Sequence, residues 1–247
     1  MPDIENQDAM GLGKFIAWTL LALVICLLGA IPQWMVLCLF GRDALIYTIA
    51  CFFVAFVVLV CMHLIELLKY WRPYNYVAMF VCYELLTLGT ASFLMNWRLS
   101  WAIAVMGVAL LFLGIALLIC LLLIYTGLYM NPFKLAVVGG MLFVLAFCIE
   151  IMNVFLCWWY WQDVAIGVFF VSVATLVISH VLITYLSFGF LGRDDCLLVA
   201  IVLYIAYILF LIACRLSAFY IEENHSITAT SSKFGASNPG HADEEFS

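Results

Sequence analysis

Residues 192–207 read GRDDCLLVAIVLYIAY, and this stretch decides the fold class. Arg193, Asp194 and Asp195 stand directly before an apolar run that holds no charged residue until Arg215. A helix needs about 20 mainly apolar residues to cross the hydrocarbon core of a bilayer, and residues 196–216 reach that length. The stretch therefore predicts a membrane-spanning helix, with the two acids at its positively polarised start.

The same pattern recurs along the chain. Of 247 residues, 68% are hydrophobic and 10% are charged, whereas soluble domains are near half apolar and a quarter charged. Because lipid offers no partner for backbone groups, only continuous helices of this kind can span it. Seven stretches qualify: 15–40, 44–68, 74–95, 100–127, 135–156, 163–188 and 196–216. We predict an all-α integral membrane protein that folds as a seven-transmembrane-helix bundle.

Two tails flank the predicted membrane domain, which covers residues 15–216. Residues 1–14 are short and acidic, and residues 217–247 are rich in Ser, Thr, Gly and acids. The second tail lacks the apolar periodicity that a folded unit needs, so we expect it to be disordered.

Several functional classes are excluded by the composition. The net charge of −6 comes mostly from the tails and no basic cluster exists, so we expect no nucleic-acid partner. The ten cysteines form no C-x-x-C pair and behave as small hydrophobic residues. Neither an H-E-x-x-H motif nor a supported nucleophile occurs, so we predict no enzyme activity, no cofactor and no metal site.

Three ionisable residues fall inside predicted spans: Glu84, Glu150 and His180. Placing a charge there costs roughly 2.5 to 3.5 kcal/mol on the translocon insertion scale, so such residues often mark ion or proton pathways. The alternative is that each carboxyl is protonated and hydrogen-bonded within the bundle, with His180 as a neutral donor. Both interpretations stay open, and both require Glu84 and Glu150 to face the bundle.

Small residues at helical spacing predict the faces on which helices pack, because they let backbones approach closely. The candidates are Gly89 to Ser92 in the third span, Ala104, Gly107 and Gly114 in the fourth, and Ser172, Thr175 and Ser179 in the sixth.

Two junctions carry a family resemblance. Residues 66–75 read ELLKYWRPYN, in which Glu66 ends the second span and Pro73 and Asn75 open the third. Before the last span, Asp194 and Asp195 are followed by Tyr204, nine residues after the second acid. Both junctions resemble those of the Lifeguard branch of the transmembrane Bax-inhibitor-motif family.

The resemblance implies a multi-pass protein of the endoplasmic reticulum or Golgi, with the plasma membrane as the alternative, that modulates calcium leak and cell death. Calcium would be the permeant ion, and membrane proteins of calcium or cell-death pathways would be the partners. The family's paired aspartates fall here at Leu186, or at Tyr185 if the loop is aligned without a gap, and at Ala206. Neither position can bind a cation or share a proton. The resemblance therefore implies a divergent member without that pair.

Two other functions remain open. The chain could be a divergent member that no longer conducts and acts as a membrane interaction or scaffold protein. It could also be an orphan seven-span receptor, although it lacks an Asp-Arg-Tyr after the third span and span count alone is weak evidence.

The basic residues predict the orientation. With the N-terminus in the cytosol, Lys14, Lys69, Arg72, Lys134 and Arg193 lie on that side, against Arg42, Arg98 and Arg215. Seven spans then place the C-terminal tail across the membrane. A glycosylation sequon moved further down the tail than the native Asn224 should be modified in microsomes. If a sequon placed before Lys14 is modified instead, the protein has the opposite orientation.

Overall fold

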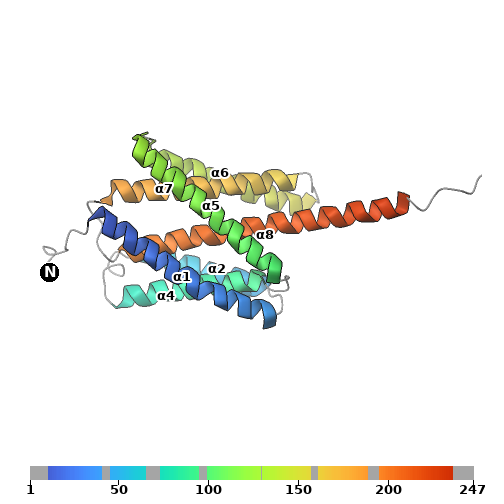
Figure 1. Ribbon diagram of the computed structural model, residues 1–247, viewed down its shortest axis with the longest axis horizontal. Helices are drawn as coiled ribbons and strands as arrows, with labels where there is room; N and C mark the ends of the chain where they lie inside the picture. The colour runs from blue at the N-terminus through green and yellow to red at the C-terminus, as the bar shows by residue number, and fades with distance from the viewer. Residues whose placement is uncertain are drawn as a thin grey trace, which may run out of the picture.

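The computed structural model describes residues 11–40, 45–64, 73–94, 99–128, 130–156, 161–188 and 195–235. Within these ranges the chain is entirely helical, with seven α-helices and no strand (Figure 1). In chain order they are α1 (Leu12–Phe40), α2 (Leu45–Leu64), α4 (Tyr74–Leu94), α5 (Leu99–Thr126), α6 (Pro132–Leu156), α7 (Gln162–Leu186) and α8 (Asp195–Gly235).

Six of the described helices are long and apolar enough to cross a membrane, which confirms a multi-pass, all-α protein. The exception is α2, whose described apolar segment, Ile46–Met62, falls short of the 18 residues that the other six exceed. The predicted count of seven spans is thus confirmed for six helices only.

Helices begin at the polar residues that separate the apolar stretches of the sequence. Asn131 stands before α6, and its Oδ1 accepts hydrogen bonds from the backbone N–H groups of Phe133 at 3.1 Å and Lys134 at 3.3 Å. Pro132, the first helical residue, has no N–H to satisfy and its ring presets the helical φ. Likewise, α8 begins at Asp195, as the two acids before the apolar run predicted.

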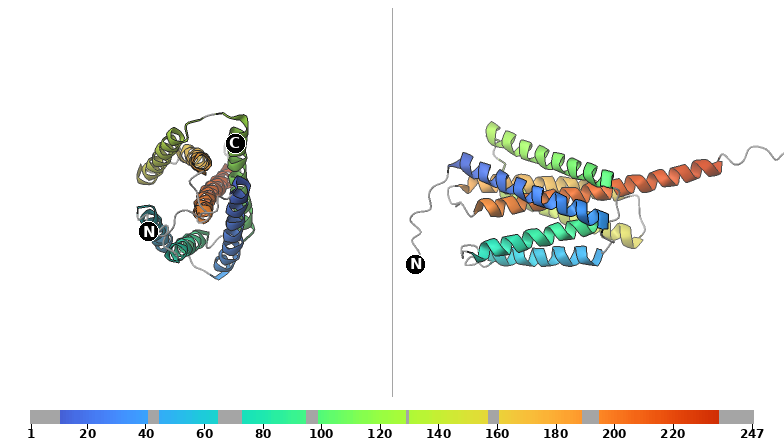
Figure 2. Two further views of the ribbon diagram at one scale, coloured as in Figure 1. Left: turned by 90° about the vertical axis from the view of Figure 1, so that its left-hand side faces the viewer. Right: turned by 60° about the horizontal axis from the view of Figure 1, so that its bottom comes forward.

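The bundle is organised around α8. This helix packs against α1, α4, α5 and α7, and the end-on view in Figure 2 places it inside the ring of the other helices. In its most apolar 18-residue segment 67% of the residues are buried, whereas the corresponding share in α6 is 11%. Asp195 and Tyr204 are half a turn out of phase because nine residues rotate a helix by about 900°, yet both are buried. Two residues on opposite sides of a helix can both be buried only if other helices cover both sides.

At the periphery, α6 and α7 form a tightly packed antiparallel hairpin (Figure 2). A Cβ built on Gly139 of α6 would lie 3.0 Å from Leu176 Cγ and 3.2 Å from the Leu176 backbone nitrogen of α7. The two helices thus approach closely at Gly139. The neighbouring Gly140 has nothing within 4 Å of such a Cβ.

The predicted packing face of α5 is wrong. Gly107 and Gly114 lie in open space and Ala104 is exposed. The inward face is instead formed by Ala102, Val105, Met106, Ala109, Leu113, Ala116 and Cys120. Both sets of residues recur at helical spacing, and α5 is apolar all round, so sequence period alone did not distinguish them. The predicted face of α4 is confirmed, with Gly89 to Ser92 buried. On α7, Ser172 and Ser179 are buried as predicted, but Thr175 is only half-buried.

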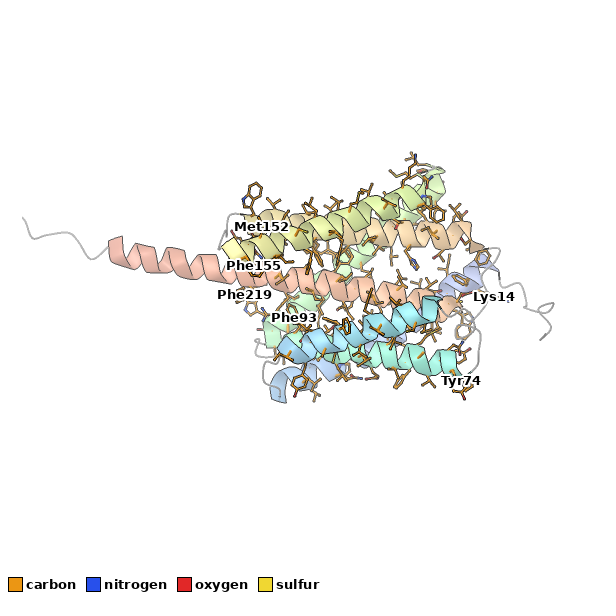
Figure 3. All side chains as sticks on the ribbon, turned by 180° about the vertical axis from the view of Figure 1, so that it is seen from behind. Lys14, Tyr74, Phe93, Met152, Phe155 and Phe219 are labelled. Atoms are coloured by element: carbon orange, nitrogen blue, oxygen red, sulfur yellow. The ribbon has the colours of Figure 1, made fainter. Side chains whose placement is uncertain are left out.

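The C-terminal helix is longer than predicted. Instead of ending at residue 216, α8 continues to Gly235 and projects beyond the bundle, past Phe219 (Figures 1 and 3). Residues 217–235 are therefore helical and not disordered, while 236–247 lie outside the described residues. The physical reason is that extending an existing helix avoids the cost of nucleation.

The Gly139 contact yields a matched test of the hairpin. Gly139→Ala should lower the free energy of unfolding by about 1–3 kcal/mol relative to Gly140→Ala, because only the first introduces a methyl group into a filled space. Both substitutions gain the same helix propensity. Thermal unfolding of the two variants in detergent would measure the difference, and equal stabilities would contradict the close approach.

Candidate functional site

A polar cluster joins three helices at the centre of the bundle. Thr87 of α4 lies at its middle: its Oγ1 is 2.8 Å from Tyr204 OH of α8 and 2.8 Å from the Tyr83 carbonyl oxygen. Trp34 of α1 donates its Nε1–H to the Thr87 carbonyl at 2.9 Å. Tyr83 donates its hydroxyl to the Cys26 carbonyl of α1 at 2.9 Å. These four side chains, Trp34, Tyr83, Thr87 and Tyr204, are called the central cluster below.

The proton positions in the central cluster follow from counting donors. A threonine hydroxyl has one hydrogen, and Thr87 Oγ1 donates it to the Tyr83 carbonyl. The Tyr204 hydroxyl must then donate to Thr87 Oγ1. Every polar side-chain hydrogen of the cluster is thereby used, so the central cluster consists of neutral, hydrogen-bonded groups.

Aromatic packing reinforces the central cluster. The Trp34 ring stacks on Tyr204 with centroids 6.5 Å apart and on Tyr207 at 6.1 Å. Tyr207 also donates its hydroxyl to the Met106 carbonyl of α5 at 3.2 Å. Gly29 is required for the contact of Tyr83 with α1, because a Cβ there would lie 2.7 Å from the Tyr83 hydroxyl oxygen. The cluster thus ties α1, α4 and α5 to α8.

A second set of polar side chains lies where α6 and α7 are connected. Gln162, the first residue of α7, donates its Nε2–H to Glu150 Oε1 at 2.7 Å and accepts from Asn153 Nδ2 at 3.3 Å. Glu150 therefore faces a neighbouring helix, as predicted. Its Oε2 is buried and has no hydrogen-bond partner in the described structure. This free oxygen is the one place among the described residues where a buried carboxylate could meet a proton or a cation.

Glu84 lies at the border between the packed and the exposed sides of α4. It is half-buried, next to the exposed residues Val77, Phe80, Val81 and Leu88, and its facing the bundle stays a prediction. The inward positions are taken by Tyr83 and Thr87, which make the contacts of the central cluster. Because α4 is apolar on both sides, the sequence did not indicate which side faces α8.

The three ionisable candidates are not brought together. His180 is half-buried on α7 and its carbonyl accepts a hydrogen bond from Thr184 at 2.8 Å. It stands 18 residues after Gln162, which is about 27 Å along the helix. His180 and the Glu150 group therefore lie near opposite ends of α7, and Glu84 is on another face of the molecule.

The residues of the family resemblance have structural roles where they are described. Asn75 is buried at the start of α4, where its Oδ1 accepts from the Tyr76 backbone N–H at 2.8 Å, and Pro73 is exposed just before it. Asp195 is buried at the start of α8 and Tyr204 is fully buried. Glu66 and Asp194 lie outside the described residues.

The positions of the missing aspartates are far apart in the structure. Leu186 ends α7 with an exposed side chain, whereas Ala206 is buried. Ala206 lies 11 residues into α8, about 16 Å along the helix. Because α7 and α8 run antiparallel (Figure 1), aspartates at 186 and 206 would be too distant to share a proton.

No protein-family model, curated protein or solved structure matches this chain at a significant level. The family resemblance therefore rests on the two junctions in the sequence.

The sequence indicated Tyr204 as a motif residue but missed the rest of the central cluster. Trp34, Tyr83 and Thr87 lie in ordinary apolar runs and carry no local signal. Their partners are Thr87, Cys26 and Tyr204, which are 53, 57 and 117 residues away. Gln162 was recognised only as part of a break between spans. Its bond to Glu150, 12 residues earlier, could have been anticipated from the hairpin that so short a connection forces.

The Thr87–Tyr204 hydrogen bond makes an asymmetric prediction. Thr87→Val should cost about 1–3 kcal/mol because it leaves the buried Tyr204 hydroxyl without an acceptor, whereas Tyr204→Phe should cost about 1 kcal/mol. In the Thr87→Val background, Tyr204→Phe should be neutral or stabilising, as measured by unfolding in detergent. Tyr207→Phe, whose hydroxyl contacts Met106, is the control and should add to Thr87→Val within about 0.5 kcal/mol. Additive Tyr204 and Thr87 effects would refute the pairing.

Proposed function

We propose that this protein is a multi-pass membrane protein of the Lifeguard, Bax-inhibitor-like type, which modulates calcium leak from the endoplasmic reticulum or Golgi and thereby cell death. One observation supports this proposal above the others. The family-type interval from Asp195 to Tyr204 covers the first ten residues of α8, the helix around which the bundle is organised, and both residues are buried. The resemblance thus falls on residues that the fold depends on.

Any calcium path in this chain must differ from one built on paired aspartates. Tyr204 is neutral and hydrogen-bonded, and Ala206, two residues later, offers no ligand. Glu150 is the candidate for a path residue, since its Oε2 is buried without a hydrogen-bond partner in the described structure and carboxylate oxygens are preferred calcium ligands.

The second candidate function is a membrane interaction protein that does not conduct. It is supported by the neutral central cluster, in which the polar side-chain hydrogens are all engaged. It is also supported by the position of Glu84 at the border of the exposed side of α4, where it is available to another protein.

Calcium flux into liposomes that contain the purified protein, compared with empty liposomes, separates the two functions. If calcium passes, Glu150→Gln should reduce the flux strongly, since the amide removes the charge but keeps the hydrogen-bonding shape. Val144→Leu, an exposed position on the same helix, is the control and should leave the flux unchanged. Flux no greater than in empty liposomes would support the non-conducting function.

The flux should also lack a steep dependence on pH near neutrality. Two carboxyls that share a proton titrate as a pair and can make a leak respond to acid, and no such pair exists at Leu186 and Ala206. The measurement is the initial calcium flux across a series of buffers between about pH 6 and 8. A steep titration that persists in His180→Gln would contradict the absence of a shared proton site.

A further inference from the structure

Glu84 stands at the midpoint of α4, ten residues from Tyr74 and ten from Leu94, and Figure 3 shows the two ends of this helix at Tyr74 and Phe93. It is half-buried, next to four exposed residues: Val77 by 57%, Phe80 by 62%, Val81 by 41% and Leu88 by 44%. Towards the C-terminal end of α4 its neighbours Thr87 and Ala91 are buried, so Glu84 stands at the border of the exposed side. The four exposed residues lie three, four or seven positions from Glu84 and so adjoin it on the helix surface. Together with Glu84 they form the outer face of α4.

The opposite side of α4 is the one that packs. Cys82 and Leu86, two residues before and after Glu84, point away from it by about 160–200° and are exposed by only 1% and 7%. Cys82 Sγ lies 3.7 Å from the Ala55 carbonyl oxygen of α2. Glu84 is therefore directed away from α2, at the middle of the candidate span Tyr74–Leu94.

No described residue gives the Glu84 carboxylate a hydrogen bond or an ion pair. A carboxyl in hydrocarbon is costly unless it finds a partner, and membrane helices usually direct such groups toward another helix. Hydrogen bonding and close packing between helices, not the hydrophobic effect, drive association in lipid. The surroundings of Glu84 thus point to an external helix as the missing partner.

A second copy of this chain does not complement Glu84. All nine Lys and Arg residues stand in the predicted junctions, in the C-terminal tail or near the ends of helices. Arg215 is six residues from the end of the candidate span Asp195–Ile221, and its guanidinium lies 5.7 Å from the Phe93 ring centroid. At the depth of Glu84 a second copy therefore offers no basic side chain that could pair with the carboxylate.

We propose that the outer face of α4 is a docking surface for a transmembrane helix of a partner protein that carries a lysine or arginine at mid-bilayer depth. The apolar residues Val77, Phe80, Val81 and Leu88 supply the van der Waals surface. Glu84 supplies the polar contact that sets both the register and the choice of partner.

The test uses the purified full-length protein in liposomes with a synthetic polyleucine transmembrane helix that carries one central lysine. Fluorescence energy transfer between the labelled helix and the labelled protein measures association. The lysine helix should bind at least about tenfold more tightly than an otherwise identical helix with leucine at that position. Glu84→Gln should remove this advantage, and Val144→Leu, at an exposed position of α6 with no polar role, should leave it intact.

Other results would overturn the proposal. They are equal binding of the lysine and leucine helices by the unsubstituted protein, or an unchanged lysine preference in Glu84→Gln. Circular dichroism and gel filtration of Glu84→Gln establish that the variant is folded before its binding is compared. Energy transfer between two labelled copies of the protein that is lost in Glu84→Gln would also overturn it, because a second copy would then occupy the face.

Discussion

The lack of hydrogen-bonding partners in lipid is the constraint on which the rest of this structure depends. Backbone groups are satisfied by making every described element a helix, but the polar side chains of the spans must find partners between helices. The central cluster achieves this through bonds of Trp34 and Tyr204 to Thr87 and of Tyr83 to α1. Because each of these bonds joins two helices, satisfying them also sets how α1, α4 and α8 are oriented.

The same constraint separates the acidic side chains into different roles. Asp195 is buried at the start of α8, where the helix dipole favours its charge. Glu150 is held near the end of α6 by Gln162 and keeps one oxygen without a hydrogen-bond partner in the described structure. Glu84 lies at the middle of α4, at the border of its exposed side. Chemistry within the protein therefore points to the α6–α7 hairpin, and recognition of other membrane proteins points to α4.

The neutral central cluster bears on how the family resemblance is interpreted. A bundle closed by Tyr204 and Thr87 is rigid and neutral, whereas a pair of aspartates would make the same region sensitive to protons. Around Ala206 the present chain has stability without a titrating group.

Sequence alone determined the helical membrane fold, the positions of most helix ends and the acidic start of α8, because these follow from local apolar length and from capping by residues such as Asn131 and Asp195. It did not determine which side of each helix packs. The spans are apolar all round, so a periodic stripe such as Ala104, Gly107 and Gly114 was indistinguishable from the true inward face. Only the tertiary structure decided these orientations, since they depend on hydrogen bonds and close contacts between residues such as Trp34, Thr87 and Tyr204 that are far apart in the chain.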